Sequence, residues 1–120
     1  MSFDVVVKRK GPFARVRISG EPTLEQLIST VHLLGIESVS WKRDAVLVDL
    51  RGIVNRFAPA EQFRLGQEAA ASLPHMRRIA SLVPADRLTR ISEKAARRDG
   101  SNVQVFDVEA DAIAWLTEKA

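Results

Sequence analysis

Near the middle of the chain stands the sequence AVLVDL, residues 45–50. It is almost continuously apolar and lacks the alternation with polar residues that marks a strand with one side in water. Such a run is typical of a strand that is covered on both faces, within a parallel or mixed sheet. The sequence therefore predicts an α/β protein in which helices cover the sheet.

Two segments before this central strand also read as strands. They are residues 3–9 and 13–19, and the Gly11-Pro12 pair between them is a turn signal. In the second segment Ala14, Val16 and Ile18 share one face, and Arg15 and Arg17 share the other. This period of two suits an antiparallel strand with one side in water.

A helix is expected between this hairpin and the central strand. Thr23 and Gln26 form a capping-box pattern, which marks the start of a helix. The apolar stripe at helical spacing then consists of Leu24, Leu27, Ile28, Val31 and Leu34. Gly35 is the expected end of this helix.

Helices and strands alternate after the central strand. The expected elements are a helix over 59–73, a strand over 78–83, a helix over 86–98 capped by Asp86, a strand over 102–106 and a last helix capped by Asp107. The full order, β-β-α-β-α-β-α-β-α, predicts one domain over residues 1–120, with a mixed sheet covered by about four helices.

The length and composition fit a single folded domain. The chain has 120 residues, 18 Lys and Arg against 15 Asp and Glu, and no Cys. Without Cys there are no disulfides and no thiolate metal sites, and no apolar run approaches the roughly 20 residues of a membrane-spanning helix. Met1 leads into a strand-like segment rather than a signal peptide. We therefore expect a cytoplasmic protein.

The sequence offers no set of residues for catalysis, so we expect neither an enzyme nor a cofactor. His32 and His75 lie far apart, and neither has a second His or a carboxylate at metal-binding spacing. No phosphate-binding or dinucleotide-binding glycine pattern is present. Asp49 ends the central strand, where sites form in doubly wound sheets, but a lone Asp there can equally bond to nearby backbone amides.

Binding to nucleic acid is also not expected. The sequence pI is about 9.8, yet the net charge is only +3. The seven Phe and Trp residues are dispersed rather than clustered as a platform for stacking bases. No helix-turn-helix or RNA-binding signature occurs.

Charge is unevenly distributed in the second half of the chain. Residues 77–98 hold seven basic and two acidic side chains, whereas residues 99–120 hold one basic and five acidic. In the helix expected over 86–98 the basic side consists of Arg87, Arg90, Lys94, Arg97 and Arg98, and the apolar side of Leu88, Ile91 and Ala95. Such a helix either simply packs its apolar side on the sheet or also presents its basic side to an anionic membrane or acidic partner.

Three stretches of the sequence resemble the SpoIIAA-like family of small bacterial proteins. They are VLVDLRGIVNRFAPAEQFRLG (46–66), RIASLV (78–83) and VQVFDVEADAIAWL (103–116). The last is the most specific, with a strand ending in Phe106, an acidic turn, and then Ala112, Trp115 and Leu116. The resemblance implies the STAS fold, which is related to lipid-carrying SEC14 domains. It also implies a non-enzymatic module that binds protein partners, nucleotides or apolar ligands, sometimes at membranes.

One departure from the family pattern concerns the helix after the central strand. In anti-sigma-factor antagonists of this family a phosphorylatable Ser begins that helix. Here residues 55–59 read Asn-Arg-Phe-Ala-Pro, with no hydroxyl, so a phosphorylation switch is not expected. Arg56 and Phe57 stand in its place. If exposed, this pair suits contact with a partner or lipid; if buried, Phe57 closes the end of the sheet.

Two functional hypotheses follow. In the first, the module binds an apolar or amphipathic, lipid-like ligand and associates reversibly with an anionic membrane, peripheral to the inner membrane. Its ligand residues would be Trp41, Phe57, Phe63, Leu88 and Ile91. Its partner or membrane surface would consist of Arg51, Arg56, Arg87, Arg90, Lys94, Arg97 and Arg98.

In the second hypothesis, the chain is a regulator that binds a partner protein through residues 51–58. Either form could act as a homodimer. A closed apolar cavity between helices and sheet would favour the first hypothesis.

Overall fold

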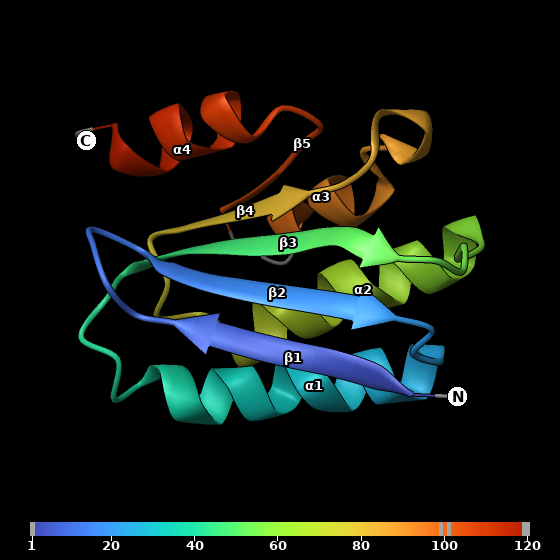
Figure 1. Ribbon diagram of the computed structural model, residues 1–120, viewed down its shortest axis with the longest axis horizontal. Helices are drawn as coiled ribbons and strands as arrows, with labels where there is room; N and C mark the ends of the chain where they lie inside the picture. Colours follow the sequence, from blue (N-terminus) through green and yellow to red (C-terminus); the bar gives the residue numbers. More distant parts are fainter. Residues whose placement is uncertain (1, 99, 101, 119–120) are drawn as a thin grey trace.

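Five strands form one mixed sheet whose spatial order repeats their order along the chain, β1-β2-β3-β4-β5 (Figure 1). In the computed structural model, which describes residues 2–98, 100 and 102–118, the strands are β1 Phe3–Lys8, β2 Ala14–Gly20, β3 Ala45–Ile53, β4 Arg78–Leu82 and β5 Val103–Phe106. The β1–β2 pair is antiparallel and the other three pairs are parallel. This arrangement confirms the predicted mixed sheet. Asp99 and Lys119, part of the charge pattern above, lie outside the described residues.

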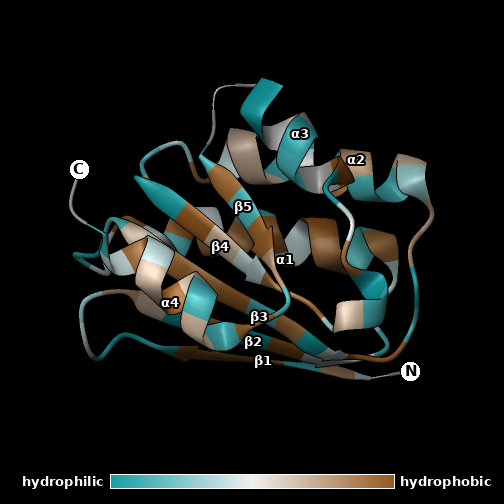
Figure 2. Cartoon of the chain, turned by 90° about the horizontal axis from the view of Figure 1, so that it is seen from above, coloured by the Kyte–Doolittle hydropathy of each residue, from teal (hydrophilic) through white to brown (hydrophobic). Residues whose placement is uncertain are grey.

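The helices cover the two faces of the sheet unequally. They are α1 Leu24–Ser38, α2 Pro59–Ser72, α3 Ile91–Arg98 and α4 Glu109–Thr117, with a short 3-10 turn, η1, over Ala85–Arg87. Figure 2 shows α4 on the side of the sheet opposite to α1, α2 and α3. Because α4 packs on β3, β4 and β5, the same face of β1 and β2 is left without a covering helix.

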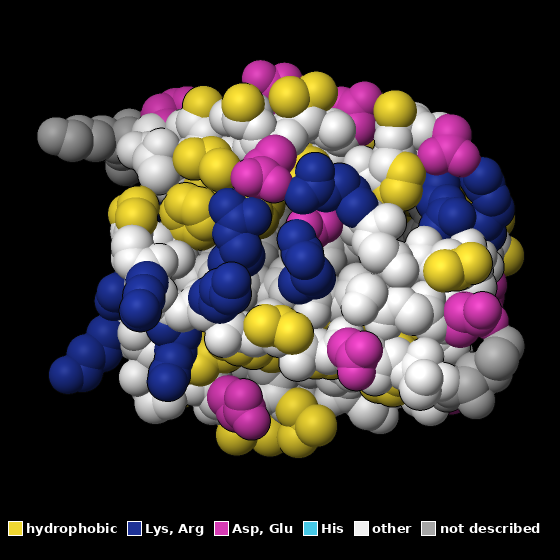
Figure 3. All heavy atoms as spheres, in the orientation of Figure 1, with side chains coloured by type: hydrophobic (Ala, Val, Ile, Leu, Met, Phe, Trp, Pro, Cys, Tyr) yellow, Lys and Arg dark blue, Asp and Glu magenta, His cyan; other side chains and the backbone are white. Residues whose placement is uncertain are grey.

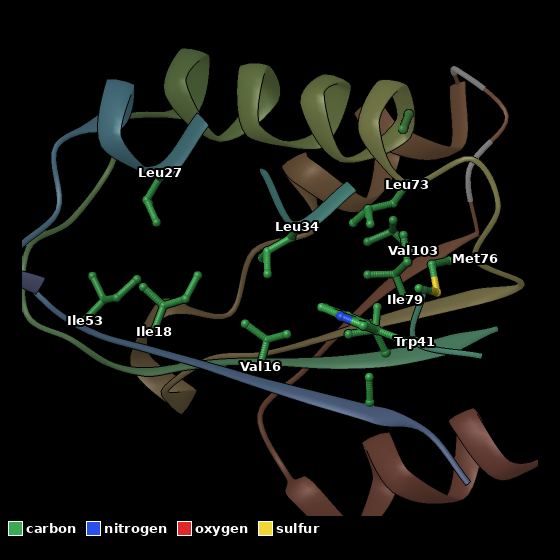
Figure 4. Packing of buried hydrophobic residues seen from close by; sticks show 13 residues of the cluster. Val16, Ile18, Leu27, Leu34, Trp41, Ile53, Leu73, Met76, Ile79 and Val103 are labelled. Atoms are coloured by element: carbon green, nitrogen blue, oxygen red, sulfur yellow. The ribbon is translucent and has the colours of Figure 1, made fainter. Parts of the chain in front are cut away.

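The middle strand β3 is buried on both faces, as its apolar sequence predicts. Val46 belongs to the larger core, between the sheet and α1 and α2, which Figure 4 shows from close by. Ala45 and Leu47 belong to the smaller core under α4. Neighbouring residues of one strand thus lie in different cores, because successive side chains of a strand point to opposite faces.

The first helix does not end at Gly35, where a stop was predicted. It continues to Ser38, and Gly35 is buried within it. A Cβ atom built on Gly35 would lie 2.2 Å from the carbonyl oxygen of Ser72, the last residue of α2. The glycine therefore serves close approach of α1 and α2 rather than termination of a helix.

The predicted helix over 86–98 is wrong at its start. Residues Ala85–Arg87 form η1 instead, Leu88 has an extended backbone, and α3 begins only at Ile91. Arg87 explains the break, because its guanidinium donates hydrogen bonds to backbone carbonyls of residues 53–55 and so holds η1 against the end of β3. The last helix also begins later than predicted, with Val108 rather than Asp107 at its N-cap.

The contact of Gly35 with α2 yields a stability prediction. On an open helix surface, Gly→Ala stabilises a protein by about 1 kcal/mol. Here we expect Gly35→Ala to destabilise the fold by about 1–3 kcal/mol, because the new methyl group must displace the Ser72 backbone. Urea unfolding measures the difference. His32→Ala, at an exposed position of the same helix, is the control and should change stability by less than about 0.5 kcal/mol. A Gly35→Ala variant as stable as this control would contradict the close approach.

Candidate functional site

An apolar cavity of about 290 Å³ lies between the sheet and the helices α1 and α2. Ile18, Val48, Ile53, Ile79 and Val103 contribute to it from the sheet, and Leu27, Val31, Leu34, Leu65 and Ala69 from the helices. Figure 4 shows Leu27 extending toward the sheet residues Ile18 and Ile53, and Leu34 toward Val16. Small side chains leave the space open, since Gly66 and Ala69 of α2 and Ser81 of β4 all line it. The structure therefore has an apolar cavity between helices and sheet, but this cavity is open at one end rather than closed.

The cavity opens at the carboxyl end of β3 and β4. All but two of its lining residues are buried or half-buried, and the two exposed ones are Arg56 and Asp86. These two side chains form an ion pair of 2.6 Å that links the segment after β3 to η1. Phe57 is half-buried beside them and lines the cavity. Each side chain of the ion pair is about two thirds exposed, with values of 63% and 64%, so this contact at the opening lies on the surface.

The segment of residues 54–58 is held in place by hydrogen bonds from several elements. Besides the bonds from Arg87, Asn55 Nδ2 donates to the Pro22 carbonyl at 2.7 Å. Gln62 Nε2 donates to the Phe57 carbonyl at 2.9 Å, and Thr89 bonds to the same Gln62 side chain. We call residues 54–58 the β3–α2 loop. Its backbone is fixed, whereas Val54 and Arg56 remain exposed on it.

The predicted ligand residues are only partly brought together. Phe57 lines the cavity, but Trp41 lies in the larger core near the opposite end, beside Met76 and Ile79 (Figure 4). Phe63, Leu88 and Ile91 are not among the lining residues, and Leu88 is exposed. Sequence patterns pointed to large aromatic and aliphatic residues, whereas the cavity is created where residues are small. The only sequence signal for it would have been the small residues of α2.

Two of the predicted basic residues, Arg97 of α3 and Arg90 just before it, hold the fold together. Arg90 and Arg97 pair with the buried carboxylate of Glu93 at 2.9 and 3.7 Å. Arg90 also donates to the Val105 carbonyl, and Glu93 accepts the Val105 amide at 2.9 Å. These bonds attach α3 to the edge strand β5. Of the predicted basic side of this helix, only Lys94 and Arg98 are exposed without an ion pair among the described residues.

Basic side chains instead gather on the uncovered face of β1 and β2 and at the adjoining end of β3, where Figure 3 shows a group of blue side chains. Strand register places Lys8, Arg15, Arg17 and Arg51 on this face. Two carboxylates lie among them. Asp49 pairs with Arg51 at 2.9 Å and with Arg17 at 3.8 Å, and Glu109 of α4 pairs with Arg51 at 2.7 Å and Arg15 at 3.5 Å. The network joins α4 to the sheet.

Asp49 is a structural carboxylate in this network. Its side chain is only 3% exposed. Burial alone would raise the pKa of Asp49, but hydrogen bonds from the Arg51 side chain and amide, together with the charges of Arg51 and Arg17, lower it overall. The Asp49 carboxylate in turn raises the pKa of Arg51. The expected bond to a backbone amide is present, from the Arg51 N–H at 3.1 Å.

Neither histidine lines the cavity. His75 Nε2 lies 2.7 Å from Ser38 Oγ at the far ends of α1 and α2, and His32 is exposed on α1. Within the described residues no three His, Asp or Glu side chains gather as a metal-ligand set. No helix in that part of the chain is long and apolar enough to cross a membrane.

The buried Asp49 predicts a pH dependence of stability. Because its pKa in the folded protein is below the ordinary 3.8, its stabilisation is fully present above pH 3.8 and is lost as the pH falls through the folded-state pKa. We expect Asp49→Asn to cost about 1–3 kcal/mol at pH 7, and this cost to shrink toward pH 2. Urea unfolding between pH 2 and 7 measures both. Asp44→Asn, which removes an exposed carboxylate, should cost less than about 1 kcal/mol. If Asp49→Asn cost the same stability at every pH, the ionised Asp49 carboxylate would not be the stabilising group.

Similar proteins were found among solved structures. No curated protein sequence matches the chain. A crystal structure of an anti-sigma factor antagonist from Mycobacterium paratuberculosis has a TM-score of 0.63 and 13% identity, covering 98% of this chain and 96% of that one. An uncharacterised protein with a SpoIIAA-like fold from Shewanella loihica PV-4 has a TM-score of 0.51 and 17% identity, covering 95% and 93%. At these identities the two structures show a common fold.

The family follows from the sequence itself. The SpoIIAA-like family model matches residues 13–117, which run from the start of β2 to the end of α4. The match includes all three stretches that carried the resemblance, together with the β3–α2 loop and the cavity. The chain belongs to the SpoIIAA-like family.

Proposed function

We propose that the protein is a non-enzymatic regulator that binds a partner protein through the β3–α2 loop. The observation that carries the proposal is a loop with a fixed backbone and exposed side chains. Arg87 and Gln62 donate hydrogen bonds to its backbone carbonyls, and the Asn55 side chain bonds to the Pro22 carbonyl. Val54 is 63% exposed, and Arg56, two residues later, is exposed as well. A loop that is ordered before binding loses little conformational entropy when a partner docks.

The chemistry of the loop indicates what its partner presents. An exposed apolar side chain next to a cation fits an apolar recess with an acidic rim. The similarity in fold to an anti-sigma factor antagonist supports a protein partner. Ala58 occupies the N-cap of α2 and makes no side-chain hydrogen bond there, so regulation would not use phosphorylation at this position.

Charge reversal on the loop tests this proposal. We expect Arg56→Glu to reduce capture of the partner more than tenfold, because like charges across an interface cost several kcal/mol. Tagged wild-type and variant proteins would be compared by quantitative pull-down from the native host. Arg64→Glu, at an exposed arginine of α2 that pairs with Glu25, is the matched control and should keep the partner. If both variants capture the same proteins as the wild type, the loop is not the binding site.

The cavity favours a second candidate function, the binding of an apolar or amphipathic ligand. A space of about 290 Å³ lies near the lower end of the range of ligand pockets, roughly 300–1,000 Å³. A dry cavity of only about 150 Å³ already holds benzene. We do not extend this candidate to a membrane surface, because Arg90 and Arg97, two residues of the predicted basic surface, form ion pairs with Glu93.

Filling the cavity tests the second candidate. We expect Ala69→Leu to abolish binding of a neutral apolar fluorophore such as 1-aminoanthracene, because the larger side chain occupies the space. The thermal midpoint should stay the same or rise by a few degrees, since the added carbons are buried. Ala71→Leu makes the same change on the exposed side of α2 and should leave binding unchanged. A wild-type protein that does not bind the fluorophore would refute this candidate.

A further inference from the structure

Two buried polar atoms on residues that line the cavity have no hydrogen-bond partner. They are Asn55 Oδ1 and Arg87 Nε. The orientation of the Asn55 amide is fixed, because its Nδ2 donates to the Pro22 carbonyl at 2.7 Å and a flipped amide would set two oxygens against each other. One end of the cavity is therefore lined by residues that hold one unused acceptor and one unused donor. Such groups are costly to leave unpaired.

The unused donor belongs to a cation without a carboxylate partner. The Arg87 Nη atoms donate to the carbonyls of Ile53, Val54 and Asn55, which are neutral groups. The neighbouring Asp86 pairs with Arg56 instead. Among the residues that the structure describes, no carboxylate lies within ion-pair distance of Arg87. A half-buried guanidinium in this state favours an anion.

The volume limits the size of a ligand. The cavity has about twice the volume of one that holds the six carbons of benzene, roughly 150 Å³. It therefore suits about a dozen non-hydrogen atoms, most of them apolar. That is the size of a medium-length aliphatic chain with a small head group, and it is well below the size of a two-chain phospholipid.

We propose that the cavity binds a medium-chain amphiphile whose head combines a carboxylate with a neighbouring hydroxyl or amide N–H. Arg87 Nε and Asn55 Oδ1 each have less than 1 Å² of accessible surface, so their side chains would shift slightly toward the cavity when the head group binds. The carboxylate would then accept from Arg87 Nε, and the hydroxyl or N–H would donate to Asn55 Oδ1. The chain would lie against Leu27, Val31 and Ile53. This inference rests on the second candidate function and adds the chemical class of the ligand to it.

A series of probes with one chain length tests the head group. The probes are 3-hydroxydecanoate, decanoate, 1-decanol and decyltrimethylammonium, each titrated calorimetrically below its micellar concentration. We expect decanoate to bind at least about tenfold more tightly than decanol, because a hydrogen bond to a charged group is worth more than one between neutral groups. We expect 3-hydroxydecanoate to bind more tightly still, and the cation not to bind.

Two variants test whether the head-group preference depends on Arg87 Nε and on Asn55 Oδ1. Arg87→Met should bring the affinities for decanoate and decanol to within about threefold of each other. Asn55→Ala should remove the advantage of 3-hydroxydecanoate over decanoate and leave the preference for an anion. Arg87 also holds the β3–α2 loop, so the thermal midpoint is measured for each variant. If Arg87→Met does not fold, the probe series on the wild-type protein still shows whether the cavity prefers an anionic head group.

The outcomes separate this inference from the function on which it rests. Equal binding of all four probes would overturn the head-group assignment but keep the apolar cavity as a binding site, with water satisfying the two polar atoms. Binding of none of the probes, together with no binding of the neutral fluorophore, would overturn both. Preference for decanol or the cation over decanoate would also contradict the assignment.

Discussion

Burial of β3 on both of its faces constrains the whole arrangement of the chain. Val46 needs the cover of α1 and α2, and Leu47 needs the cover of α4 on the other side. The helix that covers Leu47 is α4, which follows β5 at the end of the chain and packs back over β3, β4 and β5. Nothing then remains to cover the same face of β1 and β2, which explains why Arg15 and Arg17 alternate with apolar residues there.

The same packing produces the cavity. At their C-terminal ends α1 and α2 approach so closely that only glycine fits at position 35, against Ser72. One and two turns before Ser72, the small residues Ala69 and Gly66 of α2 line the cavity and leave space. One pair of helices therefore makes a tight contact at Gly35 and leaves an opening close to it. The opening lies at the carboxyl end of parallel strands, where α/β folds generally bind ligands.

Local patterns predicted the elements well, and distant contacts explain where they failed. The Thr23–Gln26 capping box is present as expected, since both partners lie within one turn. Gly35 and η1 were misjudged because their conformations depend on Ser72 and on the carbonyls at the end of β3. The cavity could not be predicted for the same reason: an empty space is made by small residues of different elements, and no spacing along the chain records it. Arg56 and Phe57, which line the cavity, stood out in the sequence because they interrupt a family pattern.

The two proposed functions meet at Arg56. Arg56 and its ion-pair partner Asp86 both line the cavity, and Arg56 is also the exposed cation of the β3–α2 loop. An exposed ion pair of this kind contributes only about 0–1 kcal/mol, so a ligand that enters the cavity can break it at little cost. Arg56 would then be released from Asp86 and free to change the charge that the loop presents. Ligand binding in the cavity and partner binding at the loop would in that case be coupled through Arg56. A ligand that breaks the Arg56–Asp86 ion pair would change the surface that the loop presents to the partner.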